Sequence, residues 1–387
     1  MASKSKKFST RCVHEGEIKD TMYQGIVSPL FMSTTYPWYG GDDPEKKPYP
    51  RYFNTPNQEF LSKKIASLEN GEKALIFTSG MAAISTSIMA NVKTGDHIVV
   101  QNDIYGGTRN FVQTEFDKFG IEYSFTDGLD PSNFSDQIKD NTVGIYLETP
   151  SNPLLKIVDL KSVSSIAKDK GIWTMIDNTF SSPVNQNPID HGIDIVLHSA
   201  TKYLGGHSDI SAGAVVSTES RIETILNSAK NFGGNLSDYT VWLLERSVKT
   251  LLIRVKEQTY NAKTLAKMLD ENINIAKVYY PGLESHPSHE IAKSQMNDFG
   301  AMMSFDLNNN VDVYSFLKSL NLIKPGMSLA GVETTVNFPM KTSHGLMTQK
   351  ERDIQGIGDK LIRLSVGIES YEDIYEDLDQ AIKSSIK

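Results

Sequence analysis

The sequence is poor in cysteine and in long apolar runs. Cys12 is the only cysteine among 387 residues. A single thiol excludes an internal disulfide and a metal site built from several cysteines, and we predict no metal site. No segment approaches the ~18 consecutive apolar residues of a membrane-spanning helix, and the first residues hold no apolar stretch of signal-peptide length. We therefore expect a cytoplasmic protein with no membrane partner, in which Cys12 has a structural or incidental role.

Concentrated positive charge is also missing. The net charge of -8 is spread along the chain, and the only basic cluster is formed by Lys4, Lys6 and Lys7. A short basic cluster at a chain end is typical of a solvated terminus. Neither nucleic acid nor an anionic membrane is therefore an expected partner.

Length and composition predict an arm followed by two domains. With 39% hydrophobic residues and no low-complexity segment, the chain can bury a large core. Residues 1–56 lack sustained periodicity but are rich in proline, glycine and aromatic residues, which predicts an extended arm that packs on a neighbouring subunit. We place one domain at 57–248 and a smaller one at 249–387.

Strand-like and helix-like segments alternate through the first domain. The strand-like runs are expected at 74–77, 97–101, 121–125, 143–147, 172–176 and 193–197. Strands separated by helices of this length predict an α/β fold with a mainly parallel sheet and helices on both faces. In such sheets a binding site forms beyond the carboxyl ends of the strands.

The last of these strands leads into the stretch HSATKYLGGHSD, which carries Lys202. This lysine follows Ser199 and Thr201 and precedes a Gly-Gly turn. Burial can keep a lysine partly unprotonated, as formation of a Schiff base requires, and neighbouring hydroxyls can bind a phosphate. The pattern fits pyridoxal phosphate (PLP), which needs both groups. A surface lysine beside serine and threonine would give the same pattern.

Residues with chemical uses lie just past several of the other predicted strands. Ser79, Tyr105, Asn152 and Asp177 all occupy such positions, so we expect them to meet Lys202 at one crevice. For each residue a structural role is the alternative. Asp177 could cap a turn, Tyr105 could fill the core, and Asn152 could satisfy a loop bounded by prolines.

A cofactor at this crevice would use these groups in distinct ways. The Asp177 carboxylate can hold the pyridine nitrogen of PLP protonated, and Tyr105 can stack on the ring. The backbone N–H groups of Gly80 and Met81 open a predicted helix, where an anion such as phosphate binds readily. An ordinary strand-to-helix turn is the alternative at that position.

The second domain differs in its pattern. Apolar residues at helical spacing predict a long amphipathic helix over 251–269 that links the two domains. Strands at 277–280, 301–307 and 361–366 with helices at 311–322 and 371–382 predict a smaller α+β domain. Arg363 lies in the last strand, and its planar guanidinium suits the carboxylate of an amino acid. A sheet-surface salt bridge is the alternative for this arginine.

Taken together, the motifs match a known family. They are YPRYFNTPNQ, FTSGMAAIS, NDIYGGT, LETPSNP, MIDNTF, HSATKYLGGHSD, YPGLESHP, SLAGVE and LIRLSVGIE. The chain resembles, over nearly its whole length, the PLP-dependent enzymes of Cys/Met metabolism. This trans-sulfuration group contains cystathionine β- and γ-lyases, cystathionine γ-synthase, methionine γ-lyase and homoserine-ester sulfhydrylases. The resemblance implies fold type I, with a seven-stranded-type sheet.

The resemblance also implies roles for individual residues. Lys202 corresponds to the PLP lysine and the acid/base, and Tyr105 to the stacking ring with a part in catalysis. The expected cofactor contacts are Gly80, Met81, Tyr105, Asp177, Thr179, Ser199, Thr201 and Lys202. The expected clamp on the substrate carboxylate is Asn152, Arg363 and Ser328.

Two arm residues complete the implied site. Tyr49 and Arg51 match the arm tyrosine and arginine that the family places in the active site of a neighbouring subunit, where they contact the cofactor and the tyrosine assists catalysis. This implies a homotetramer built as a dimer of catalytic dimers.

Several positions depart from the family pattern. Met327 and Pro48 stand where enzymes acting on cystathionine tend to have acidic residues that could bind its distal ammonium. After the YGGT motif, Arg109 precedes Asn110, which is the reverse of the order in the family. This reversal affects a contact between the arginine and a distal carboxylate of the substrate. Gly107 replaces the cysteine of methionine γ-lyases. The arm motif RYFNTPN also differs from the usual RxxNPT.

From these residues and this resemblance we predict a PLP-dependent carbon–sulfur lyase of cystathionine or a related thioether amino acid. γ-Replacement on an activated homoserine ester is the nearest alternative, followed by methionine γ-lyase activity. A PLP-carrying protein without turnover and a doubly wound binding protein without PLP are the non-enzymatic alternatives.

Overall fold

The computed structural model describes residues 6–40, 47–342, 344–345 and 347–387. Lys4, the first member of the basic cluster, lies outside the described residues. The strands are β1 Lys73–Phe77, β2 His97–Gln101, β3 Glu122–Thr126, β4 Thr142–Glu148, β5 Trp173–Asp177, β6 Ile195–His198, β7 Gly213–Ser217, β8 Ile275–Tyr279, β9 Met302–Leu307, β10 Lys324–Pro325, β11 Thr335–Asn337 and β12 Leu361–Ser365.

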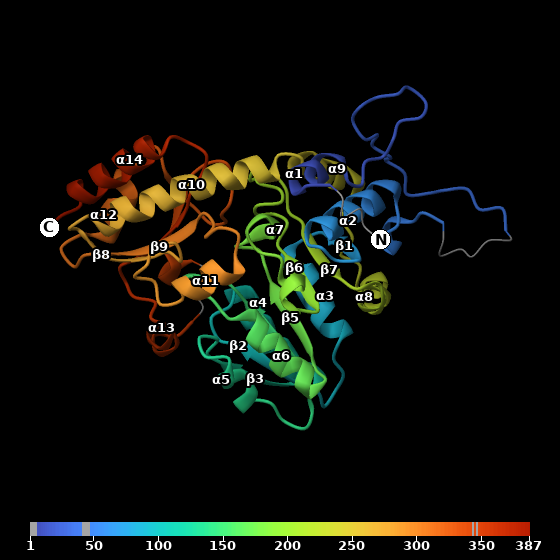
Figure 1. The fold of residues 1–387 in the computed structure, drawn as a ribbon, viewed down its shortest axis with the longest axis horizontal. Coiled ribbons are helices and arrows are strands. Elements are labelled where there is room, and N and C mark those ends of the chain that lie inside the picture. The colour runs from blue at the N-terminus through green and yellow to red at the C-terminus, as the bar shows by residue number, and fades with distance from the viewer. Residues whose placement is uncertain (1–5, 41–46, 343, 346) are drawn as a thin grey trace.

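Helices surround these strands (Figure 1). They are α1 Phe8–His14, α2 Pro56–Leu68, α3 Gly80–Ala90, α4 Gly106–Phe119, α5 Ser132–Asp136, α6 Leu160–Lys170, α7 Ser182–Asn185, α8 Glu219–Phe232, α9 Asp238–Val248, α10 Leu251–Asp270, α11 His289–Gln295, α12 Val313–Ser319, α13 Gln349–Gln355 and α14 Tyr371–Ser384. None of the described helices combines the length and the apolar character needed to cross a membrane.

The larger sheet confirms the predicted α/β architecture. Its seven strands have the order β1-β7-β6-β5-β4-β2-β3. Strands β2 to β6 pair in parallel, while β7 runs antiparallel to both β6 and β1. Because β7 is antiparallel to both of its neighbours, β1 and β6 point in the same direction. The carboxyl ends of β1, β4, β5 and β6 therefore lie along one edge of the sheet.

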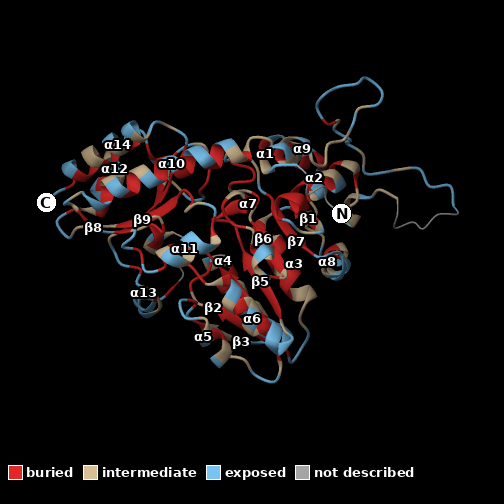
Figure 2. Ribbon diagram, in the orientation of Figure 1, coloured by how far each residue is buried: buried red, intermediate tan, exposed pale blue. Residues whose placement is uncertain are grey.

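Successive residues of the buried strands face two different cores. Ile76 and Ile145 belong to the cluster that includes side chains of α2 and α6. Phe77 and Tyr146, the next residues along, belong to the cluster formed with α3, α4 and α8. This alternation is the period of a strand covered on both faces. Figure 2 shows the result, with buried strands between helices that expose only their outer sides.

The smaller sheet lies in the second domain. Its order is β10-β11-β12-β9-β8, with antiparallel pairing except between β10 and β11. The helix expected over 311–322 ends at Ser319. The helix does not continue to residue 322 because the backbone N–H groups there donate to the Asp377 carboxylate. The donors are Asn321, Leu322 and Ile323, at 2.8, 3.0 and 2.8 Å.

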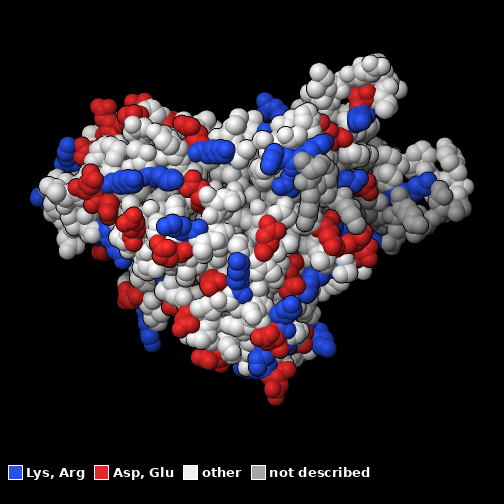
Figure 3. Space-filling model, in the orientation of Figure 1, with Lys and Arg blue, Asp and Glu red and all other residues white. Residues whose placement is uncertain are grey.

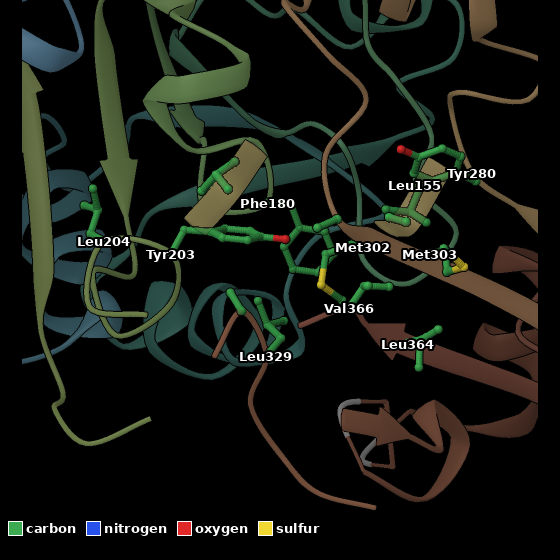
Figure 4. Packing of buried hydrophobic residues seen from close by; sticks show 14 of the residues in the cluster. Leu155, Phe180, Tyr203, Leu204, Tyr280, Met302, Met303, Leu329, Leu364 and Val366 are labelled. Atoms are coloured by element: carbon green, nitrogen blue, oxygen red, sulfur yellow. The ribbon is translucent and has the colours of Figure 1, made fainter. Parts of the chain in front are cut away.

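The two domains share one hydrophobic core. Phe180 and Tyr203 come from turns of the larger domain, Met302 begins β9, and Val366 directly follows β12. All four belong to the same buried cluster, and Figure 4 shows their side chains meeting at the junction. The relative position of the two sheets is thus fixed by packed side chains, which matters for a site built between them.

The arm lies against the larger domain only in part. Helix α1 is anchored where the buried Lys64 ammonium donates to the carbonyl oxygens of Cys12 and Val13, at 3.1 and 2.9 Å. Burial raises the pKa of the Cys12 thiol to about 11, so it stays protonated. Further along, Ile26 is 94% exposed and Tyr39 is 95% exposed. Figure 1 shows this part of the arm looping away from the body.

Candidate active site

A pocket of about 570 Å³ lies at the carboxyl edge of the larger sheet, between the two domains. It contains most of the residues predicted from the sequence. They are Ser79, Gly80, Met81, Tyr105, Asn152, Asp177, Thr179, Ser199, Thr201, Lys202, Ser328 and Arg363. The structure therefore brings together residues that are as much as 284 positions apart, Ser79 and Arg363.

Lys202 is presented on a tight turn that follows β6. Its backbone N–H donates to the Ser199 carbonyl at 3.0 Å, and its own carbonyl accepts from Gly206 at 2.6 Å. Its Nζ donates to the Ser328 hydroxyl at 2.5 Å. Burial, followed by the positive charge of Arg363, lowers the pKa of Lys202 to about 8, although Asp177 opposes the shift. A usable fraction of this amine is consequently neutral and nucleophilic near neutral pH.

Asp177 forms the last residue of β5 and is buried. Burial raises its pKa, and hydrogen bonds from Thr179 oppose that rise; the Thr179 backbone N–H lies 3.0 Å from Asp177 Oδ1. A buried carboxylate is stabilised by a cationic partner that also donates a hydrogen bond. A protonated ring nitrogen would be such a partner.

The start of α3 has the features of a phosphate site. The Ser79 hydroxyl caps the helix by accepting from the Ala82 N–H at 3.1 Å, and the N–H groups of Gly80 and Met81 belong to the first turn, where helices leave donors unpaired. A β-carbon on Gly80 would lie 2.7 Å from the Ser199 β-carbon. Only glycine therefore lets the Ser199 hydroxyl approach this helix end.

The two hydroxyls near Lys202 are not equivalent. Thr201 Oγ1 donates to the Ala212 carbonyl at 3.2 Å and accepts from the Ala212 N–H at 3.0 Å. Ser199 makes a backbone contact, its N–H donating to Thr179 Oγ1 at 2.8 Å. Thr201 thus ties the lysine turn to the residue that directly precedes β7, in addition to lining the pocket.

Arg363 brings a buried cation from β12 of the smaller sheet. One terminal nitrogen donates to Asn152 Oδ1 at 2.8 Å, and the other donates to the Ser328 carbonyl at 3.3 Å. Burial lowers the pKa of Arg363 to about 10, which leaves the guanidinium charged at neutral pH. Its Nε is buried without a hydrogen-bond partner among the described residues. A substrate carboxylate would supply the missing acceptor.

Glu148 belongs to the site, although the sequence analysis gave it no role. This fully buried carboxylate ends β4 and accepts from the backbone N–H of Tyr105 at 2.7 Å, so it fixes the start of the loop that carries the tyrosine ring. Burial raises its pKa well above the usual range. Its position at the end of a buried strand, in the motif LETPSNP, was the sequence signal that could have identified it.

A buried histidine–carboxylate contact behind Asp177 was also missed. His198 Nε2 lies 2.6 Å from Glu69 Oε1, and the same oxygen accepts from the Asn178 amide at 2.8 Å. No sequence motif points to Glu69, because its partner lies on a strand that follows much later in the chain.

The outer end of the pocket is lined by longer polar side chains and by Met327. Arg109 does not point freely into it. Its guanidinium donates to Asn102 Oδ1 at 2.8 Å, lies 4.1 Å from the centre of the Phe125 ring, and forms a loose pair with Glu351 at 3.7 Å.

Tyr49 and Arg51 are not among the residues that line this pocket. Arg51 donates to the Lys230 carbonyl at 2.7 Å and stacks over the Tyr52 ring at 5.3 Å. Tyr49 is exposed. Within one chain these two residues are therefore separate from the other predicted site residues.

The pocket residues fit PLP. The donors at the start of α3 match a phosphate, the buried Asp177 matches a ring nitrogen, and the Lys202 amine of lowered pKa matches a carbonyl. Arg363, whose Nε is unpaired among the described residues, lines the same pocket and matches an amino-acid carboxylate. Each of these groups would therefore find a partner in bound PLP or in a bound amino acid.

Comparison with known proteins agrees with this geometry. The family model described as Cys/Met metabolism PLP-dependent enzyme matches residues 9–383. The chain is 40% identical over 375 residues to a cystathionine β-lyase from Lactococcus lactis subsp. cremoris, covering 97% of this chain and 98% of the relative. It is 40% identical to a cystathionine γ-lyase from Bacillus subtilis over 379 residues, covering 98% of this chain and 100% of the relative.

A solved structure is similar as well. The cystathionine γ-lyase from Lactobacillus plantarum complexed with L-serine superposes with a TM-score of 0.94 at 37% identity, covering 98% of this chain and 99% of that chain. The match therefore extends over the arm, the larger domain and the smaller domain. The chain belongs to the Cys/Met-metabolism family of PLP-dependent enzymes, and its cofactor is pyridoxal phosphate.

Proposed function

We propose that the protein is a carbon–sulfur lyase that cleaves cystathionine or a related thioether amino acid by β- or γ-elimination. The observation that carries this proposal is the juxtaposition of the Lys202 amine with the buried Arg363–Asn152 pair in one pocket. The similarity to a cystathionine β-lyase and a cystathionine γ-lyase supports the choice of substrate.

In the proposed reaction, PLP supplies an electron sink for the pair left on the substrate α-carbon. Arg363 and Asn152 hold the α-carboxylate and thereby orient the α-hydrogen toward Lys202. Lys202 Nζ removes that proton, and the Ser328 hydroxyl, 2.5 Å from Nζ, positions the amine. The hydroxyl of Tyr105, or of Tyr49 from a neighbouring subunit, donates a proton to the departing sulfur.

The two eliminations differ in the bond that breaks. In β-elimination, cystathionine and water give homocysteine, pyruvate and ammonia. In γ-elimination they give cysteine, 2-oxobutanoate and ammonia, and a second proton must leave from the β-carbon. Lys202 can perform that transfer too, so the same residues serve both reactions.

γ-Replacement on an activated homoserine ester is the second candidate, since it begins with the same proton transfers. Methionine γ-lyase activity is less favoured by the geometry at Gly107. A β-carbon at that position would lie 2.5 Å from Cε1 of the Tyr105 ring, so a cysteine there would require the ring to move. The tyrosine position in this chain thus suits glycine.

The test is to incubate the PLP-loaded enzyme with L-cystathionine and identify the products by mass spectrometry. Pyruvate with homocysteine establishes β-elimination, and 2-oxobutanoate with cysteine establishes γ-elimination. If neither pair forms, the proposal of a lyase for cystathionine fails. Formation of cystathionine from cysteine and a homoserine ester would then support γ-replacement, and no turnover with any of these amino acids would favour a PLP-carrying binding protein.

We also propose a homotetramer of catalytic dimers in which Tyr49 and Arg51 enter a neighbouring active site. The exposed apolar side chains of the arm, among them Ile26 and Tyr39, support this arrangement because such side chains are normally covered. Sedimentation analysis of the full chain should give the mass of four subunits. Arg51→Ala should weaken PLP retention without altering the fold. The cytoplasmic location stays a prediction from the sequence.

A further inference from the structure

A second cavity, of about 710 Å³, lies along one face of α10 and shares no lining residue with the candidate active site. Its other wall is formed by α7 and by Asn297 and Asp298. The α10 residues that line it recur at helical spacing. They are Leu252, Lys256, Thr259, Tyr260, Lys263, Thr264, Lys267 and Met268.

Positive charge dominates this cavity. Three lysines, Lys256, Lys263 and Lys267, line it against one carboxylate, Asp298. Asp298 lies 3.2 Å from the Lys263 ammonium, which leaves Lys256 and Lys267 without an ion pair to any described residue. Figure 3 shows lysine and arginine side chains following α10 on this face of the molecule.

Two of the residues that line the cavity carry buried polar groups without a partner among the described residues. Thr259 and Asn185 are only 2% and 3% exposed. The Thr259 hydroxyl and the Asn185 amide nitrogen have no hydrogen-bond partner among the described residues. Leaving buried donors unpaired is costly, and natural proteins usually satisfy them with protein, water or ligand.

The Asn185 side of the cavity is held rigidly. The Asn297 backbone N–H donates to the Asn185 carbonyl at 2.7 Å, and the Asn297 amide donates to the Val184 carbonyl at 3.0 Å. These bonds fix α7 against the 297–298 loop. The unpaired Asn185 amide therefore has little freedom to find an acceptor elsewhere in the protein.

We propose that this cavity binds a small organic anion whose carboxylate accepts hydrogen bonds from Thr259 and Asn185 while its apolar body lies against Val184 and Leu252. Lys256 and Lys267 attract the charge from the rim. The site is independent of the proposed lyase function, because its residues take no part in that chemistry.

Hexanoate is a suitable probe, and hexanol is its uncharged counterpart of equal chain length. Hydrogen exchange of the PLP-loaded enzyme, followed by mass spectrometry, reports α10 and α7 separately from the active-site loops, where a carboxylate can also bind Arg363. Hexanoate should slow exchange in α10 and α7, and hexanol should not. Absence of protection there, or equal protection by hexanol, would overturn the proposal.

Substitutions can distinguish a specific binding site from nonspecific attraction by surface charge. Thr259→Val should weaken hexanoate binding about tenfold, because one hydrogen bond to a charged group is lost, while Thr259→Ser keeps the hydroxyl and should restore binding. The double variant Lys256→Gln/Lys267→Gln should weaken it about five- to tenfold. Lys318→Gln, an exposed lysine on α12, is the matched control. If the lysine variants weaken binding but Thr259→Val does not, the cavity is no specific site.

Discussion

The inner and outer ends of the candidate active site differ in how firmly their charged groups are held. At the inner end, Lys202, Asp177 and Arg363 are each fixed by a hydrogen bond, of 2.5, 3.0 and 2.8 Å respectively. At the outer end, Arg109 is fixed by Asn102, but its charged partner Glu351 is partly exposed and lies 3.7 Å away, and Met327 is 79% exposed. Bond breaking requires fixed geometry, whereas substrate choice is adjusted by side chains that can change without disturbing the fold. The pocket thus separates chemistry from selectivity.

The largest effect is expected from Lys202→Ala. Without the amine there is neither a covalent attachment for PLP nor a base at the α-carbon, so turnover of cystathionine should fall at least ~1000-fold. Steady-state kinetics and the visible absorbance of the cofactor would measure both losses. Lys318→Ala is the control and should retain full activity. Residual turnover within tenfold of the parent enzyme would remove Lys202 from the mechanism.

Arg363→Lys should act mainly on substrate binding. Lysine keeps the charge but cannot bridge Asn152 and a carboxylate at once, so kcat/KM should fall about 10- to 100-fold, chiefly through a higher KM. The surface change Arg221→Lys serves for comparison. A fall in kcat with an unchanged KM would instead assign Arg363 to the chemical step.

The pH dependence of the inner end can be tested in the apoenzyme. Below its pKa of about 8, Lys202 carries a proton and cannot attack a carbonyl. The rate of PLP incorporation should therefore rise about tenfold per pH unit below pH 8 and level off above it. Replacing Arg363 by glutamine removes a positive charge that lowers this pKa, so the midpoint should move upward. A midpoint that stays in place would rule out that influence.

The smallest effect is expected at the outer end. Glu351→Gln retains the hydrogen bonding that caps α13 but removes the charge facing Arg109. The kcat/KM for cystathionine, whose distal end is charged, should change by about two- to threefold, while that for S-ethylcysteine should not change. Equal changes for both substrates would mean that the pair has no part in selectivity.

The inner end was largely predictable because a simple rule places it. Asp177 ends a recognisable buried strand, Asn152 and Lys202 each follow one, and parallel strands bring their carboxyl ends together. The α/β fold itself was predicted on the same ground and is confirmed. Strand β7 was not predicted, because it returns antiparallel directly after the lysine turn with no helix between.

Other features depend on contacts that leave no local pattern. The pairing of β12 with β9 sets where Arg363 stands relative to Asn152, and no spacing in the sequence encodes that distance. The orientation of Arg109 depends on Asn102, Phe125 and Glu351, which come from three separate elements. Side-chain direction at such points is decided by tertiary packing, so it became visible only in the structure.

The buried cluster that joins Phe180 and Tyr203 to Met302 and Val366 has a consequence for unfolding. Neither domain can lose its packing without exposing apolar surface of the other, so we expect heat or denaturant to unfold both in one cooperative transition. A subunit would then either hold the cofactor residues and the carboxylate clamp together or lose them together. Partly active species with only one half of the site intact should accordingly be rare.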